Sequence, residues 1–292
     1  MRLDDSRESA NVEDRRGMRG GFGGRGRGLA VGGGAGGIVL LLLSLFLGVD
    51  LTGLGGGADP APEPRRMERE GGGPGVPADD AGRRFVSRVL AETEDVWKPV
   101  FEQLGRRYQE PRLVLFTGAV QSACGSADAA VGPFYCPGDQ RVYIDLDQLA
   151  RMQQSLGAQG DFAAAYVVAH EVGHHVQNQL GILPRVQQLK ARASETESNA
   201  LQVRVELQAD CLAGLWARRA HETRRILERG DVEEGLRAAA AVGDDTLQRR
   251  ARGVVVPESF THGSAEQRVR WFRAGLQAGR LEACDTFSAE RI

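Results

Sequence analysis

Two histidines and a glutamate stand at a spacing that suits metal-dependent hydrolysis. In the segment AHEVGHHVQ, His170 and His174 are four residues apart, and Glu171 follows the first of them. On a helix, residues four apart lie on one face, so both imidazoles can hold one ion, while Glu171 can reach a water beside it. This H-E-x-x-H pattern predicts a site for a single zinc ion, Zn²⁺, with Glu171 as general base.

The neighbouring residues favour a metal site over a pair of ordinary surface histidines. The segment from Asp161 to Leu180 is rich in alanine and other apolar residues and contains no proline, which predicts a mostly buried helix. Its flanks around the motif are uncharged, so the histidines would be buried without a partner unless a metal satisfied them.

The third protein ligand of a catalytic zinc site has to come from elsewhere in the chain. Gln177 and Leu180 exclude the longer motif in which the same helix supplies a third histidine. A second predicted helix, residues 199–220, carries Glu206 and Asp210 on one face among apolar residues, where carboxylates are costly to bury unless paired or coordinated.

We therefore predict Glu206 as the third ligand. Asp210 is then the acceptor that fixes the tautomer of a ligating histidine, with His170 as the expected partner. The alternative is an exposed acidic stripe that pairs with Arg204 or Arg218.

Three further residues near these segments have less specific patterns. His175 points about 100° away from His174 on the helix, which indicates packing or a hydrogen bond on another face. His262 lies in the loop SFTHGSAEQR, and we predict that it is catalytic, as a donor to the oxyanion of a tetrahedral intermediate. Arg268 is a second candidate donor. The alternatives are a helix-entry cap for His262 and a surface ion pair for Arg268.

These residues together predict peptide-bond hydrolysis. Zinc lowers the pKa of a bound water to about 7, and Glu171 would take its proton and pass it to the departing amine. The alternating segment RVYIDL, residues 141–146, is expected to be an edge strand along which a peptide substrate lies.

The elements that position these residues form one predicted α+β domain, mostly helical with a small sheet. We expect a helix over residues 83–108, strands over 112–116 and 141–146, and then the two metal-binding helices. A helical pair follows over residues 230–253, divided at Gly243.

The N-terminal quarter differs from this domain in composition. Most of the 39 glycines precede residue 75, and residues 29–49 contain no charge over a length that spans a bilayer. We predict a disordered basic tail over residues 1–28, a transmembrane anchor over 29–49, a flexible linker over 50–80, and the zinc domain over 81–292.

Arginines precede the predicted span and acidic residues follow it, which predicts a cytoplasmic N-terminus and a domain on the other side of the membrane. The alternatives are a cleaved signal peptide and a buried core helix. The Gly/Arg-rich run resembles RNA-binding segments. However, the 37 basic and 39 acidic residues nearly balance and the arginines already have a topological role, so no nucleic-acid partner is predicted.

All four cysteines follow the predicted span, in a compartment where disulfides form. Cys124 and Cys136 bracket a short loop, which favours that pair and, by elimination, the pair Cys211–Cys284. Free buried thiols and a second metal site are the alternatives, although the paired C-x-x-C spacing of a thiolate cluster is absent.

Four segments resemble the bacterial putative neutral zinc metallopeptidase family, the YpfJ-like group: GPFYCPGDQRVYIDL, AHEVGHHVQ, RVELQADCLAGLWA and VVPESFTHGSAEQRVRWF. The similarity runs from about residue 83 to residue 287. It implies a basic N-terminus, one span and a gluzincin-like peptidase domain, with His170, His174 and Glu206 as zinc ligands and Glu171 as the catalytic residue.

Two rival functions remain open. In one, zinc only stabilises the fold or a partner-binding surface of an envelope protein. In the other, the site hydrolyses a non-peptide amide. Glu171 disfavours the first, because a purely structural site gains nothing from that carboxylate. The oligomeric state is not readable from the sequence.

Overall fold

The computed structural model of the chain describes residues 1–17 and 80–292. The predicted span, residues 29–49, lies outside the described residues, as does the predicted linker up to residue 79. Among the helices of these two described stretches, none is both long enough and apolar enough to cross a bilayer.

Helices make up most of the described chain, and the α+β class is as predicted. They are α2 (Ala81–Gln103), α3 (Leu146–Leu156), α4 (Asp161–Gln179), α5 (Ile182–Lys190), α6 (Glu195–Arg224), α7 (Asp231–Ala241), α8 (Asp244–Arg252) and α9 (Ala265–Ala278), with 3-10 turns η2 (Ala129–Val131), η3 (Pro257–Ser259) and η4 (Leu281–Cys284). The predicted helical pair divided at Gly243 is present as α7 and α8.

The main sheet has the strand order β1-β2-β6-β5. Its strands β1 (Val12–Asp14), β2 (Arg112–Leu115) and β6 (Arg141–Ile144) are parallel, and β5 (Phe134–Cys136) is antiparallel to β6. A separate hairpin joins β3 (Ala119–Ser122) to β4 (Gly125–Asp128).

The prediction of an edge strand at residues 141–146 is wrong. Strand β6 lies between β2 and β5, and three consecutive residues of it, Val142, Tyr143 and Ile144, are almost fully buried. A parallel strand inside a sheet is covered on both faces, so the alternation in the sequence does not mark an exposed edge. A peptide that adds to this sheet would have to pair with β1 or β5, its two edge strands.

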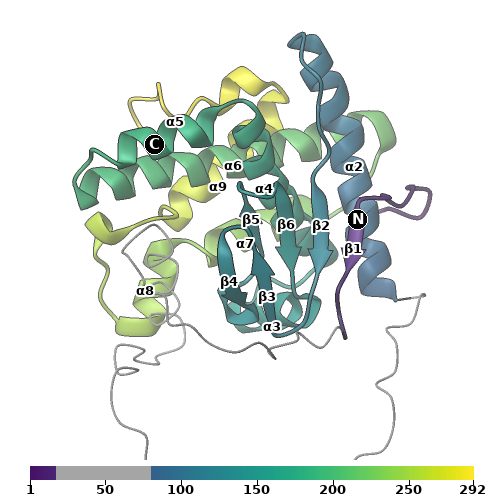
Figure 1. The fold of residues 1–292 in the computed structure, drawn as a ribbon, viewed down its shortest axis with the longest axis horizontal. Coiled ribbons are helices and arrows are strands. Elements are labelled where there is room, and N and C mark those ends of the chain that lie inside the picture. Colours follow the sequence, from purple (N-terminus) through teal and green to yellow (C-terminus); the bar gives the residue numbers. More distant parts are fainter. Residues whose placement is uncertain (18–79) are drawn as a thin grey trace, which may run out of the picture.

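The main sheet lies on one side of the molecule next to α2, and on the other side α6 packs against both α4 and α9 (Figure 1). The core where α4, α6 and α9 meet contains the buried rings of Phe162, Trp216 and Phe272, one from each helix. Helices α6 and α9 approach closely, since a Cβ atom on Gly275 would lie 1.9 Å from the carbonyl oxygen of Cys211. This crossing brings residues of α9 against the middle of α6.

Residues 1–17 belong to the folded domain, so the prediction of a disordered tail is wrong for this part of it. Strand β1 pairs with β2, and the buried carboxylate of Glu94 on α2 accepts hydrogen bonds from Arg7 (2.6 Å), Ser9 (2.5 Å) and Asn11 (2.9 Å). The segment is ordered by polar contacts to distant residues, which a count of its apolar side chains does not detect.

The position of residues 1–17 affects the predicted membrane topology. Residues 1–17 and the domain form one folded body. A single membrane crossing between them would hold the two parts on opposite sides. The two states, a docked N-terminal segment and a single crossing between residues 17 and 80, therefore exclude each other in any one molecule.

Replacing Glu94 with alanine is expected to release the N-terminal segment. Three hydrogen bonds to a buried charge are lost together, so trypsin should cleave after Arg7 about tenfold faster or more. Glu8→Ala is the matched control, because Glu8 forms only a 3.7 Å exposed pair with Arg83. Equally rapid cleavage of the unmodified protein would contradict a docked segment.

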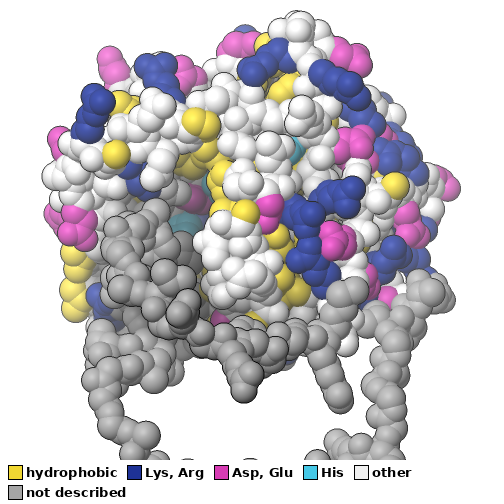
Figure 2. All heavy atoms as spheres, viewed as in Figure 1, with side chains coloured by type: hydrophobic (Ala, Val, Ile, Leu, Met, Phe, Trp, Pro, Cys, Tyr) yellow, Lys and Arg dark blue, Asp and Glu magenta, His cyan; other side chains and the backbone are white. Residues whose placement is uncertain are grey.

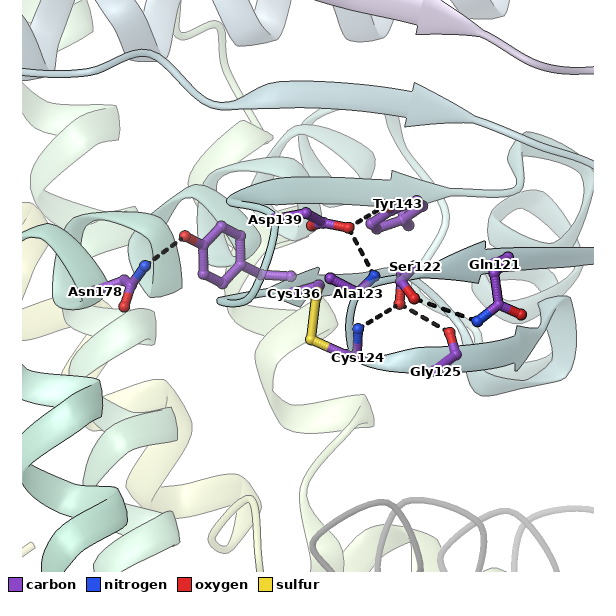
Figure 3. The surroundings of a disulfide bond; sticks show 10 residues. Gln121, Ser122, Ala123, Cys124, Gly125, Cys136, Asp139, Tyr143 and Asn178 are labelled. Atoms are coloured by element: carbon purple, nitrogen blue, oxygen red, sulfur yellow. Dashed lines mark hydrogen bonds between the residues drawn. A yellow bond between two sulfur atoms is a disulfide. The ribbon is translucent and has the colours of Figure 1, made fainter. Parts of the chain in front are cut away.

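Both predicted disulfides, Cys124–Cys136 and Cys211–Cys284, are confirmed. The first ties the turn of the β3–β4 hairpin to the end of β5, beside Asp139, which accepts hydrogen bonds from Tyr143 and from the backbone of Ala123 (Figure 3). The second ties α6 to η4 near the C-terminus. The described residues contain no free cysteine.

Candidate metal centre

Helices α4 and α6 meet at a close crossing inside the predicted site. A Cβ atom on Gly173 would lie 3.1 Å from the carbonyl oxygen of Ala209, so a larger residue would push the helices apart. The crossing lies one residue from His174 and one residue from Asp210. Close contact of the two backbones therefore brings the histidines of α4 against the carboxylates of α6.

The three predicted ligands converge on one point. One ligand atom from each of His170, His174 and Glu206 lies within 4.8 Å of the other two. Glu206 Oε2 is 3.2 Å from His170 Nε2 and 3.5 Å from His174 Nε2. Nitrogen and oxygen ligands bound tetrahedrally to zinc at 2.0–2.1 Å lie roughly 3.3–3.4 Å apart, so this donor set fits zinc.

The other ring nitrogen of each histidine is held by a buried acceptor. His170 Nδ1 is 2.9 Å from Asp210 Oδ1, and His174 Nδ1 is 2.9 Å from Gln177 Oε1. An acceptor at Nδ1 keeps the proton there and leaves Nε2 free to bind a metal. The structure thus brings Asp210 to His170, as the sequence predicts.

Asp210 is also the centre of a buried cluster. Its carboxylate accepts two 2.9 Å hydrogen bonds from the Arg268 guanidinium and a 2.5 Å bond from the Tyr166 hydroxyl. Burial alone would raise the pKa of Asp210, but Arg268 and His170 hold it below the usual range. Asp210 therefore stays ionised and orients His170.

The cluster shows that Arg268 turns inward. Its side chain is almost fully buried, and its guanidinium binds Asp210 and Tyr166 behind His170. These contacts place Arg268 beside Asp210, through which it supports His170. The surface ion pair weighed as its alternative is absent, because the side chain is buried.

A second buried chain of amides supports His174, and the sequence did not point to it. Gln177 donates to Val205 O (2.8 Å) and to Gln208 Oε1 (3.0 Å), and Gln208 donates to Cys284 O (2.9 Å). This chain links His174 to the segment held by the Cys211–Cys284 disulfide. The only available signal was a glutamine three residues after His174, on the same helix face.

Glu171 lies beside the ligands with its carboxylate unpaired. No other described side chain or backbone group donates a hydrogen bond to it, and its oxygens still reach solvent although the residue is 8% exposed. Burial raises the pKa of Glu171, while His174 and His170 oppose that rise. A carboxylate with a raised pKa and solvent contact is suited to exchange a proton with water.

His262 lies near the ligands but is held by a residue that sequence reasoning missed. Asp244, at the start of α8, accepts backbone hydrogen bonds from Thr261, His262 and Gly263, and its other oxygen is 3.3 Å from His262 Nδ1. Burial opposes protonation, but this contact and the charge of Glu206 raise the pKa of His262. When the ring is protonated, Nδ1–H binds Asp244 and Nε2–H is left as a donor.

His175 has a packing role, in agreement with its expected position. It is fully buried, with Nδ1 3.0 Å from the Tyr135 hydroxyl and Nε2 2.6 Å from the carbonyl oxygen of Gln109. Burial lowers the pKa of His175 to about 4. Its ring is therefore neutral at neutral pH and faces the sheet rather than the metal ligands.

The ligand side chains reach the surface of the protein. Those of His170, His174 and Glu206 are 8%, 13% and 10% exposed. Figure 2 shows a histidine side chain at the bottom of a hollow in the face viewed. Each of the three ligand side chains thus keeps some contact with solvent, as a catalytic metal site with an open position requires.

The chain is similar to known proteins over most of its length. The model of the family described as "Putative neutral zinc metallopeptidase" matches residues 1–287. The uncharacterized protein YpfJ of Escherichia coli K12 is 51% identical over 211 residues, which cover 72% of this chain and 73% of that protein.

The uncharacterized protein Rv2575 of Mycobacterium tuberculosis H37Rv is 44% identical over 223 residues, with the same shares covered. No solved structure matches the chain.

Proposed function

The chain belongs to the putative neutral zinc metallopeptidase family, and on this premise we propose that it is a zinc-dependent peptidase that hydrolyses peptide bonds with Glu171 as general base. In this proposal the pair of helices that supplies His170, His174 and Glu206 forms a gluzincin-like metal site.

One observation carries the proposal. Three donor atoms stand at the separations that tetrahedral zinc requires, and an unpaired carboxylate with solvent contact lies beside them. A metal that only stabilised the fold would have no use for that carboxylate. An enzyme that activates water needs it.

The chain's own residues have separable tasks in this proposal. When bound, zinc would polarise the scissile carbonyl and acidify the attacking water. Glu171 accepts the proton of that water and returns it to the leaving amine. The Nε2–H of His262, oriented by Asp244, donates a hydrogen bond to the oxyanion as charge develops.

Metal removal tests the proposal directly. Purified protein should cleave a quenched-fluorescence peptide library or an unfolded protein, and a zinc chelator should lower the rate by about 100-fold or more, because three converging ligands lose the group they hold. Equimolar Zn²⁺ should restore the rate, and Mg²⁺ should not. Undiminished turnover by protein that metal analysis shows to be free of zinc would refute the proposal.

Attachment to the bacterial inner membrane is a separate proposal. It is supported by the length and lack of charge of residues 29–49 and by two disulfides, which favour a domain outside the cytoplasm. With residues 1–17 docked, a cysteine introduced at Glu8 should be labelled from the same side as the domain. Labelling from opposite sides would show that the segment leaves the sheet in cells.

A further inference from the structure

A lysine stands beside the candidate metal centre in a chain that otherwise uses arginine. Of the 37 basic residues, only Lys98 and Lys190 are lysines. Lys190 is the last residue of α5, which packs on both α4 and α6 next to the ligands. A lysine at the C-terminal end of a helix can act only through its favourable interaction with the helix dipole. Its side-chain contacts show whether Lys190 has a further role.

The Lys190 side chain turns towards the metal ligands. Its ammonium donates a 2.7 Å hydrogen bond to Gln202 Oε1, and Gln202 Nε2 donates a 2.8 Å bond to Glu206 Oε1. The other oxygen of Glu206 faces the two histidines. One side-chain amide therefore separates the ammonium from the carboxylate that would bind zinc.

The charge of Lys190 has no direct counterpart. No carboxylate of the described residues lies within 4.0 Å of its ammonium, whereas Lys98 pairs with Glu110. Burial lowers the pKa of Lys190, and the charge of Glu206 opposes this effect only in part. Once a dication is held at Glu206, the negative charge there is balanced by the metal, and Lys190 is left half-buried without compensation.

We propose that Lys190 binds a carboxylate of the substrate next to the scissile bond. The inference rests on the proposed peptidase function and specifies its substrate class: peptides with a C-terminal carboxylate or an Asp or Glu side chain close to the cleaved bond. Gln202 is the positioning residue, because its amide holds the ammonium at a set place relative to Glu206.

The separation between the Lys190 ammonium and Glu206 limits where the substrate carboxylate can lie. An extended peptide advances about 3.3–3.6 Å per residue. Only the side-chain amide of Gln202 separates the Lys190 ammonium from Glu206. We therefore expect the ammonium to contact substrate groups that lie one or two residues from the scissile carbonyl. An ammonium has three donors and Gln202 takes one of them, so two N–H groups remain for the substrate.

A binding measurement tests this independently of turnover. Zinc-loaded full-length protein carrying Glu171→Gln is titrated with N-terminally dansylated tetra-alanine, with its C-terminal amide, and with amides in which Glu or Gln replaces each alanine in turn. We expect the carboxylate form or one Glu form to bind about 10- to 100-fold more tightly than its neutral counterpart. The form that binds tightly identifies the source of the carboxylate.

Substitution of the lysine should remove this preference. In Lys190→Met the affinity ratio of charged to neutral peptide should fall to about one, and Lys190→Arg should retain part of it. The matched control Lys98→Met should leave the ratio intact, because Lys98 pairs with Glu110 on another part of the surface.

Amine-reactive labelling adds a second readout. A bound carboxylate peptide should protect Lys190 and leave Lys98 unprotected as the internal reference. Equal affinities for charged and neutral peptides, or a preference that survives Lys190→Met, would overturn the inference while the peptidase proposal stands. A wild-type protein that cleaves no peptide would instead remove the proposed function.

Discussion

Glu171→Gln is expected to lower kcat by about 10²- to 10⁴-fold while the protein still binds one equivalent of zinc. Glutamine preserves the size of the side chain but cannot accept the proton of the attacking water. The three ligands are untouched, because no described residue hydrogen-bonds to the Glu171 carboxylate and its loss leaves no partner unsatisfied. The expected signature is full metal content with almost no turnover.

Steady-state kinetics on a cleaved library peptide and metal analysis of the same sample check this result. His262→Ala is the companion variant, since it removes the proposed oxyanion donor and keeps the base. It should lower kcat by about 10²- to 10³-fold with little change in KM or zinc content. Turnover by Glu171→Gln at the wild-type rate would exclude this glutamate as the base and with it the proposed mechanism.

The candidate metal ligands could be predicted from the sequence because their geometry is local. His170 and His174 share a face through helical spacing alone, and Glu206 and Asp210 repeat that spacing on a second helix. Burial then limits the choices, since carboxylates among apolar neighbours need a partner. These conditions do not depend on knowing how the rest of the chain folds.

The residues that orient the ligands do so through contacts between distant segments of the chain. Most of these contacts could not be predicted from the sequence. Asp244 reaches His262 across 18 residues, and Gln208 binds a carbonyl 76 residues further along the chain. Arg268 has the polar character of a surface residue, and only the close α6–α9 crossing shows that it is buried against Asp210. No spacing rule records such contacts.

The N-terminal segment and the position of β6 were missed for the same reason. A strand of three residues such as β1 has too little sequence for a periodic pattern, and its order comes from β2 and Glu94, each more than 80 residues away. Strand order is likewise set by partners that alternation does not identify.

Asp210→Ala is expected to be the most destabilising single change near the centre. The Arg268 guanidinium, the Tyr166 hydroxyl and the His170 Nδ1–H would all lose a buried acceptor at once. Breaking a buried ion pair from one side costs about 3–5 kcal/mol of unfolding free energy, because an uncompensated charge remains in the interior. Zinc affinity should fall as well, by about 10- to 100-fold, since His170 loses the group that fixes its tautomer.

Denaturant unfolding in the presence of a chelator separates the loss of stability from the loss of metal. Glu222→Ala is the matched control. It breaks an Arg218–carboxylate pair of 2.6 Å whose side chains are about half exposed, and should change the unfolding free energy by no more than about 0.5 kcal/mol.

A double variant separates the two sources of the lost unfolding free energy. If the loss in Asp210→Ala arises from the unpaired Arg268 guanidinium, Asp210→Ala/Arg268→Met should be less destabilised than Asp210→Ala alone, because no unpaired charge stays buried. A double variant at least as unstable as the single one would place the cost in lost packing around Tyr166 instead of in the charge of Arg268.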